Sequence, residues 1–254
     1  MVLNQERIST REKLILTGLY LSKYDSAGLK RLGFDGFVEA FNVIGYALGS
    51  RPASIKNYRD EFDPFFPNAR KGWRKRPMRA YCHKVFEEYE SLDMEPFTAL
   101  VESFVGYDAN RWSAVRTVAG EPDGDGQFAA RLATGLAAEQ YFESVQPTLP
   151  EFKGYTLENT TRFGCGYDFR LSAPTGTGPL AVEVKGLRDR TGSVSMTPKE
   201  HNAAATMTDS FFLFVVKNFR EEPFHEVFQD PLSSRLSFQM SERVTVQVAW
   251  LATV

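Results

Sequence analysis

Three residues in the C-terminal half of the chain have the types and spacing for metal-dependent chemistry. Asp168 lies in the β-prone run 166–172, and Glu183 and Lys185 lie in the β-prone run 179–185. Side chains alternate along a strand, so Glu183 and Lys185 share one face. If the two runs pair as neighbouring strands, Asp168 comes to lie beside Glu183.

Two carboxylates at this spacing form a site for a hard divalent cation, which prefers oxygen ligands. Such an ion neutralises a phosphate, activates water and stabilises the leaving oxygen, as phosphodiester hydrolysis requires. We therefore predict Asp168 and Glu183 as ligands of Mg²⁺ and Lys185 as the residue that orients or activates the water. Glu139, on an otherwise apolar stretch, is a candidate for a third carboxylate. An exposed strand with alternating charges would give the same residue pattern, but the order of elements around it favours the active-site interpretation.

These residues must be positioned by an α/β domain, which we predict over residues 127–254. Its expected elements are a helix at about 128–145, β-prone runs at 153–160, 166–172, 179–185, 211–217 and 243–251, and a helix at about 197–209. The acidic, glycine-rich segment 120–126 is the best linker candidate in the chain. We therefore place a domain boundary there.

The sequence of residues 1–119 predicts an all-helical domain. A capping box formed by Ser9 and Glu12 opens a helix that ends near Lys23. Further helices are expected at about 35–48, from 52 to just before Pro64, at 78–92 and at 96–105. A short turn containing Gly49 separates the second and third helices, an arrangement typical of a helix-turn-helix.

A basic block over residues 51–84 indicates a polyanionic partner. It holds ten Lys and Arg against three acids in a chain whose net charge is −2. Basic residues contact phosphates, and Asn or Arg at the start of a second helix can read base edges. A solvated charged surface is the alternative interpretation. The candidate DNA-binding residues are Arg51, Ser54, Lys56, Asn57, Arg59, Arg70, Lys71, Trp73, Arg74, Lys75 and Arg76.

Residues 135–216 resemble the PD-(D/E)xK restriction-endonuclease-like superfamily, and within it the nuclease-like domain at the C-terminus of the plant NO VEIN protein. The matching stretches are 135–139, 166–169, 182–186 and 196–200, followed by two alanines at 203–204. The resemblance implies a mixed central sheet flanked by helices and Mg²⁺-dependent DNA cleavage. It also implies that Asp168 and Glu183 bind the metal, that Lys185 positions the water, and that Glu139 is the accessory carboxylate. Tyr167 stands where the superfamily often has proline.

Together these observations predict a sequence-specific, restriction-type endonuclease that hydrolyses double-stranded DNA. Cutting both strands needs two active sites, so we expect a homodimer. No run approaches the roughly 18 apolar residues of a membrane span, and the N-terminus is too charged for a signal peptide, so we expect a cytoplasmic protein. In a reducing compartment Cys82 and Cys165 are expected to be free thiols. Two alternatives stay open: a catalytically inert DNA-binding regulator, and a DNA-binding subunit of a larger defence complex.

Overall fold

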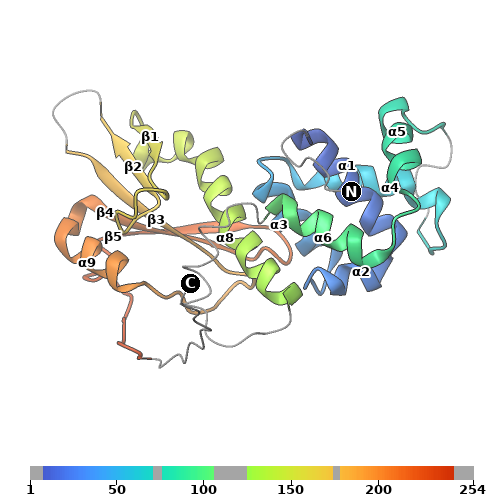
Figure 1. Cartoon of the computed structure of the whole chain (residues 1–254). Coiled ribbons are helices and arrows are strands. Elements are labelled where there is room, and N and C mark those ends of the chain that lie inside the picture. Colours follow the sequence, from blue (N-terminus) through green and yellow to red (C-terminus); the bar gives the residue numbers. More distant parts are fainter. Residues whose placement is uncertain (1–7, 71–75, 106–124, 174–177, 243–254) are drawn as a thin grey trace, which may run out of the picture.

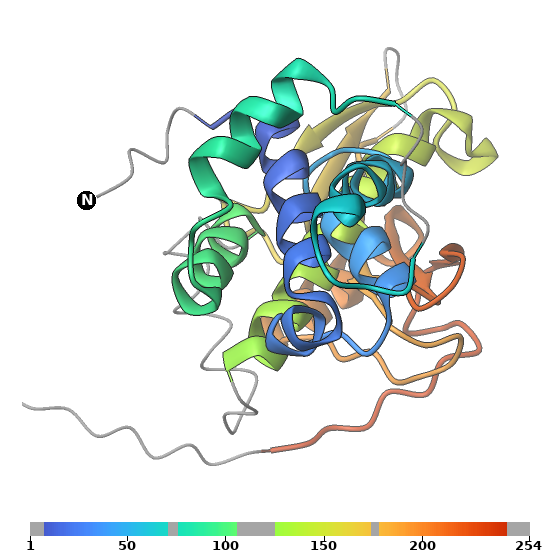
Figure 2. The same ribbon diagram turned by 90° about the vertical axis from the view of Figure 1, so that its right-hand side faces the viewer.

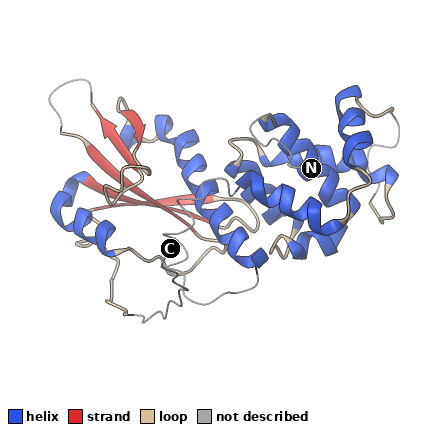
Figure 3. Ribbon diagram, viewed as in Figure 1, coloured by secondary structure: helices blue, strands red, loops and turns tan. Residues whose placement is uncertain are grey.

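The computed structural model describes residues 8–70, 76–105, 125–173 and 178–242. Helices form the N-terminal part, and a sheet with flanking helices forms the C-terminal part (Figure 1, Figure 3). The predicted order of a helical region followed by an α/β region is therefore confirmed. No helix within the described ranges has the length and apolar character needed to cross a bilayer.

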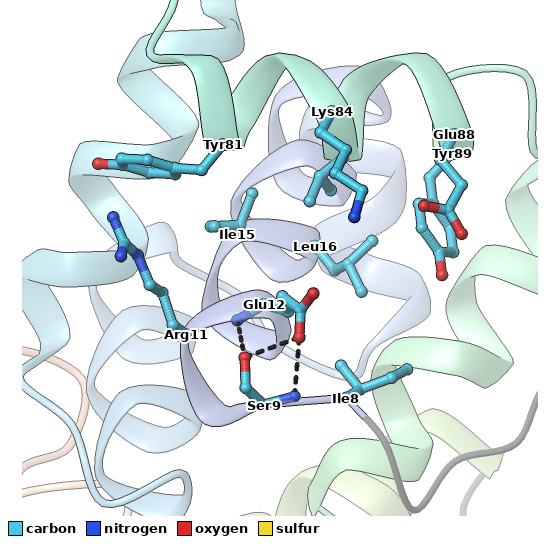
Figure 4. Close-up of a pocket in the computed structure, with 11 residues that line it drawn as sticks. Ile8, Ser9, Arg11, Glu12, Ile15, Leu16, Tyr81, Lys84, Glu88 and Tyr89 are labelled. Atoms are coloured by element: carbon cyan, nitrogen blue, oxygen red, sulfur yellow. Dashed lines mark hydrogen bonds between the residues drawn. The ribbon is translucent and has the colours of Figure 1, made fainter.

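The N-terminal helices follow the sequence prediction closely. Ser9 and Glu12 form the predicted capping box, in which the Ser9 N–H donates to Glu12 Oε2 at 2.9 Å (Figure 4). A short helix, α2, was not predicted, because its seven residues are too few to show a period. The helices are α1 (Thr10–Lys23), α2 (Asp25–Arg31), α3 (Phe37–Ala47), α4 (Pro52–Phe62), α5 (Ala80–Tyr89) and α6 (Met94–Val105).

Helix α4 packs against both α1 and α3 within the bundle of helices drawn in blue and green in Figure 2. A side chain at Gly18 of α1 would place its Cβ 2.5 Å from the Cβ of Tyr58 on α4, so only glycine permits this close crossing. The turn from α3 into α4 passes through Gly49, whose φ of +63° favours glycine. Pro52 then opens α4 in its first turn, as predicted.

The sheet is mixed and has five strands in the order β1-β2-β3-β4-β5. Neighbouring strands are antiparallel except β3 and β4, which are parallel and are connected through α9 (Pro198–Met207). The first four strands match predicted β-prone runs, although β3 ends one residue beyond its run. Strand β5 was not predicted, and the run at 243–251 lies outside the described residues. The strands are β1 (Thr156–Asn159), β2 (Phe169–Ser172), β3 (Leu180–Gly186), β4 (Phe211–Lys217) and β5 (Phe224–Gln229).

Helices cover both faces of this sheet. Phe142 of α8 (Asp125–Val145) packs against Phe169 and Phe214, with ring centroids 5.1 and 4.8 Å apart. Ala204 of α9 instead shares a buried cluster with Ala181 of β3. Because side chains alternate along β3, the face that carries Ala181 also carries Glu183 and Lys185.

The helical part and the sheet part are packed against each other rather than separate. One buried cluster runs from α1 to the sheet. Helix α3 lies along α8, and the Tyr46 ring meets the Tyr141 ring edge-on at 5.4 Å. The buried Asn42 amide donates to the carbonyl oxygens of Phe219 and Glu221, each at 2.8 Å. These contacts fix how α3 sits on the C-terminal part.

Replacing Asn42 by Ala should lower the free energy of unfolding by about 1–3 kcal/mol, because two backbone acceptors lose their donor. Chemical denaturation measures this change. Asn57→Ala is the matched control, because Asn57 is exposed on α4, and its effect should stay within about 0.5 kcal/mol. Equal losses in the two variants would show that the Asn42 bonds do not hold the parts together.

Candidate active site

Strand pairing brings Asp168 beside Glu183, as the sequence predicted. Phe169 pairs with Val182 in the antiparallel β2–β3 register, so Asp168 lies opposite Glu183 one position further on. The Asp168 N–H donates to the Val182 carbonyl at 3.1 Å. Its carboxylate Oδ2 accepts from the Val184 N–H at 3.0 Å. The backbone of β3 therefore holds this carboxylate at the start of β2.

Glu183 and Lys185 lie side by side on the α9-facing side of β3. The Lys185 Nζ is 2.6 Å from Glu183 Oε1 and 2.7 Å from Glu200 Oε2. The Glu183 residue is only 3% exposed, so its charge has little water to stabilise it. The lysine ammonium is therefore a cation shared by the buried carboxylate of Glu183 and the half-buried carboxylate of Glu200.

Burial and neighbouring charge shift the acid–base behaviour of this group. Burial first, and then the negative charge of Asp168, raise the pKa of Glu183 well above its usual range, although Lys185 opposes the shift. Burial disfavours the Lys185 ammonium, but the charges of Glu183 and Glu200 outweigh burial and raise the pKa of Lys185. Lys185 therefore stays protonated at neutral pH. A second cation beside Asp168 and Glu183 would relieve their mutual repulsion.

Glu200 belongs to this site; the sequence left open whether it lines the site or only caps a helix, and in the structure it does both. Its Oε2 accepts from Lys185 and also from the Thr197 N–H at 2.9 Å, while its own N–H donates to Thr197 Oγ1 at 3.3 Å. These bonds form the capping box that opens α9. The spacing of Thr197 and Glu200 signals a helix start, but nothing in it indicates contact with Lys185.

Glu139 is buried on α8, with 9% of its surface exposed. The described ranges contain no group of three His, Cys, Asp or Glu side chains that could hold a metal ion. Glu139 therefore does not complete a three-carboxylate cluster with Asp168 and Glu183. Its role as an accessory carboxylate stays a prediction.

The two remaining carboxylates fit a hard divalent cation by their chemistry. Asp168 and Glu183 offer oxygen ligands, and Mg²⁺ in proteins commonly binds one or two carboxylates and keeps several waters. The negative charge of Asp168 contributes to the raised pKa of Glu183. A cation bound at this position would lower that pKa again. Asp168 and Glu183 are thus the residues that would hold the ion.

The predicted DNA-binding residues divide into three groups. Arg51, Lys56 and Asn57 are exposed on and just before α4, and Ser54 is half-buried there. Lys56 also pairs with Asp60 at 2.7 Å. Those that lie outside the described residues are Lys71, Trp73, Arg74 and Lys75.

Three predicted DNA-binding arginines lie in structural ion pairs, which the sequence did not indicate. Arg59 is only 8% exposed and lies over the rings of Phe37 and Phe41. The other two are Arg70, which pairs with the buried Asp63 at 2.7 Å, and Arg76, which pairs with the buried Glu61 at 3.2 Å. Their guanidinium groups balance buried carboxylates inside the helical part. Contact with DNA by these three residues stays a prediction.

Two cavities lie away from the carboxylates. One of about 840 Å³ lies between α1 and α5 and is lined by Arg11, Leu16 and Tyr81 among others (Figure 4). Another of about 620 Å³ lies where α8 and the end of β3 meet the helical part, and Gly186 and Arg188 line it. Neither is lined by Asp168 or Glu183.

Comparison with known families places this site within one matched segment. Residues 138–229 match the family model described as "Protein NO VEIN, C-terminal". The match covers just over a third of the chain, from inside α8 to the end of β5, and it includes Glu139, Asp168, Glu183, Lys185 and Glu200. No curated protein and no solved structure matches the chain.

Proposed function

We propose that this protein is a Mg²⁺-dependent endonuclease that hydrolyses phosphodiester bonds in double-stranded DNA. The observation that carries the proposal is the ion pair between the buried Glu183 and the half-buried Lys185 on β3, with Asp168 opposite Glu183. The match of this segment to a family with nuclease-like character supports the same conclusion. Among nuclease-like families, this arrangement of Asp, Glu and Lys is the one expected of the PD-(D/E)xK superfamily.

Each residue of the site has a distinct task in this proposal. Asp168 and Glu183 hold Mg²⁺, which when bound neutralises the phosphate and lowers the pKa of water. Lys185, kept protonated by its neighbours, donates hydrogen bonds that orient the attacking water or the phosphate oxygens. Glu200 acts through Lys185, because it holds the ammonium at the start of α9. Glu139 is proposed as a supporting carboxylate.

The helical part would hold the DNA. Arg51, Lys56 and Asn57 present exposed polar groups at the start of the second helix of the α3–α4 pair, where a helix-turn-helix contacts the major groove. Recognition there would make cleavage sequence-specific. Cutting both strands requires two active sites, so the working enzyme would be a homodimer. We also propose a cytoplasmic location.

Digestion of plasmid and phage DNA by the purified protein tests the proposal. With Mg²⁺ we expect discrete fragments, and with EDTA none. Lys185→Ala should reduce cleavage by at least about 100-fold, because it removes a charged hydrogen-bond donor from the reacting centre. Lys217→Ala is the matched control, because this lysine of the neighbouring strand also forms a half-buried ion pair, with Glu226 at 2.9 Å. It should cleave as the wild type does.

Two results would contradict the proposal. Binding of DNA without cleavage, on both methylated and unmethylated substrates, would favour an inert regulator or a subunit that needs partners. Cleavage that survives in Lys185→Ala would place the active site elsewhere.

A further inference from the structure

The loop that connects β1 to β2 ends at Asp168 and is closed at its base. The Thr160 N–H donates to the Asp168 carbonyl at 2.8 Å, and Thr160 Oγ1 donates to the Tyr167 carbonyl at 3.1 Å. Inside the loop, the Phe163 N–H donates to the Thr160 carbonyl at 2.9 Å. These bonds fix the backbone of residues 160–168 relative to the carboxylate of Asp168.

The same loop rests on the first turn of α9. Gly166 has a φ of +88°, and a Cβ there would lie 2.6 Å from the carbonyl oxygen of Lys199. Gly164 has a φ of +64°, and a Cβ there would lie 3.8 Å from Lys199 Nζ. This turn also contains Glu200, which contacts Lys185. The loop is therefore held between the two elements that build the active site.

Phe163 extends from this fixed loop into solvent, with 70% of its surface exposed. A single exposed aromatic residue is common on protein surfaces and needs no explanation by itself. Here its backbone is hydrogen-bonded, the adjacent Arg162 is exposed, and the exposed Lys199 lies against the same loop. An aromatic face flanked by cations is the combination that binds a nucleobase together with its phosphates.

We propose that Phe163 stacks on a nucleobase that leaves the duplex stack beside the phosphate that is cleaved. This inference rests on the proposed endonuclease function and adds a contact from the catalytic part itself. The cations Arg162 and Lys199 would hold the flanking phosphates. Because Asp168 closes the loop, a base held by Phe163 would fix the strand relative to the carboxylates.

Binding measurements in a Lys185→Ala background test the stacking while keeping the DNA intact. The probes are duplexes that the wild type cuts, with 2-aminopurine placed in turn at the bases on either side of the mapped cut. Phe163→Ala and Phe163→Leu should weaken binding by about fivefold or more and abolish the change in 2-aminopurine fluorescence that binding produces, because neither side chain has a π face. Phe163→Trp should keep both the affinity and the fluorescence change.

The cysteines provide a second readout that does not depend on fluorescence. Cys165, two residues from Phe163, is exposed, whereas Cys82 is buried and burial raises its thiol pKa to about 12. Iodoacetamide should therefore alkylate Cys165 selectively, and bound DNA should slow this reaction. The chain has only these two cysteines, so mass spectrometry can follow the modification without engineering.

The outcomes separate this inference from the function on which it rests. If the wild type cleaves DNA but Phe163→Ala and Phe163→Leu bind as tightly as Phe163→Trp, the stacking proposal is wrong and the endonuclease proposal stands. Alkylation of Cys165 at an unchanged rate in the DNA complex would also overturn the stacking proposal. A wild type that neither binds nor cuts DNA would overturn both.

Discussion

Glu183→Gln is expected to abolish cleavage and, at neutral pH, to raise the melting temperature. Cleavage should fall by at least about 100-fold, because the amide cannot supply the negative ligand that a divalent cation needs. Stability should rise because burial and the charge of Asp168 make the ionised Glu183 unfavourable in the folded protein. Fragment assays and calorimetry on the same samples measure the two effects.

The sign of the stability change follows from proton linkage. A carboxyl group whose pKa is raised on folding binds more protons in the folded state, so the wild type loses stability as pH rises from the ordinary value of 4.5 through the raised pKa of Glu183. The stability of Glu183→Gln should therefore exceed that of the wild type only slightly near pH 4.5, and the difference should grow toward neutral pH. Added Mg²⁺ should stabilise the wild type and leave Glu183→Gln unchanged.

Glu226→Gln provides the matched control with the opposite sign. Hydrogen bonding from Lys217 lowers the pKa of Glu226, so its carboxylate is favoured by folding, and the amide should give a slightly lower melting temperature at neutral pH. Cleavage should not change. A Glu183→Gln variant that melts below the wild type at neutral pH would show that the ion pair with Lys185 outweighs burial and the repulsion from Asp168.

Gly186→Ala is expected to destabilise the fold and to impair cleavage together. An added Cβ would lie 2.7 Å from the carbonyl oxygen of Thr134 on α8, and a backbone atom cannot turn aside as a side chain can. Either α8 or the end of β3 must shift, at a cost of about 1–3 kcal/mol. Because Lys185 precedes Gly186, the shift should also disturb the lysine. Denaturation and single-turnover cleavage measure the two losses.

Gly135→Ala separates this steric effect from the general effect of replacing glycine. Gly135 lies on the same helix, and a Cβ there would meet nothing within 4 Å. Alanine should instead stabilise α8 by up to about 1 kcal/mol, because it has the higher helix propensity. If Gly186→Ala were as stable as the wild type, the close approach of α8 to β3 would not be required for the fold.

Much of the fold could be predicted because the signals are local. The capping boxes at Ser9 and Thr197 and the proline at the start of α4 each fix a helix end within a few residues. Strand alternation also placed Glu183 and Lys185 on one face. Strand β5 was not recognised, because polar and apolar residues alternate little at its centre. Most of its residues are half-buried in the structure.

The parts of the site that could not be predicted depend on contacts between distant segments. Glu200 reaches Lys185 only because α9 crosses the face of β3. The basic block was interpreted as a surface for DNA because a sequence does not show burial. In the structure its acids Glu61 and Asp63 are buried and bind arginines of the same block, so part of the positive charge is used internally.

The double contact of Glu200 also limits which residues can replace it during evolution. One oxygen, Oε2, serves both the backbone at the start of α9 and the ammonium of Lys185. Glutamine would preserve the helix start but not the charge, and aspartate would keep the charge on a shorter arm. Selection for helix stability and selection for the contact with Lys185 therefore act on a single side chain.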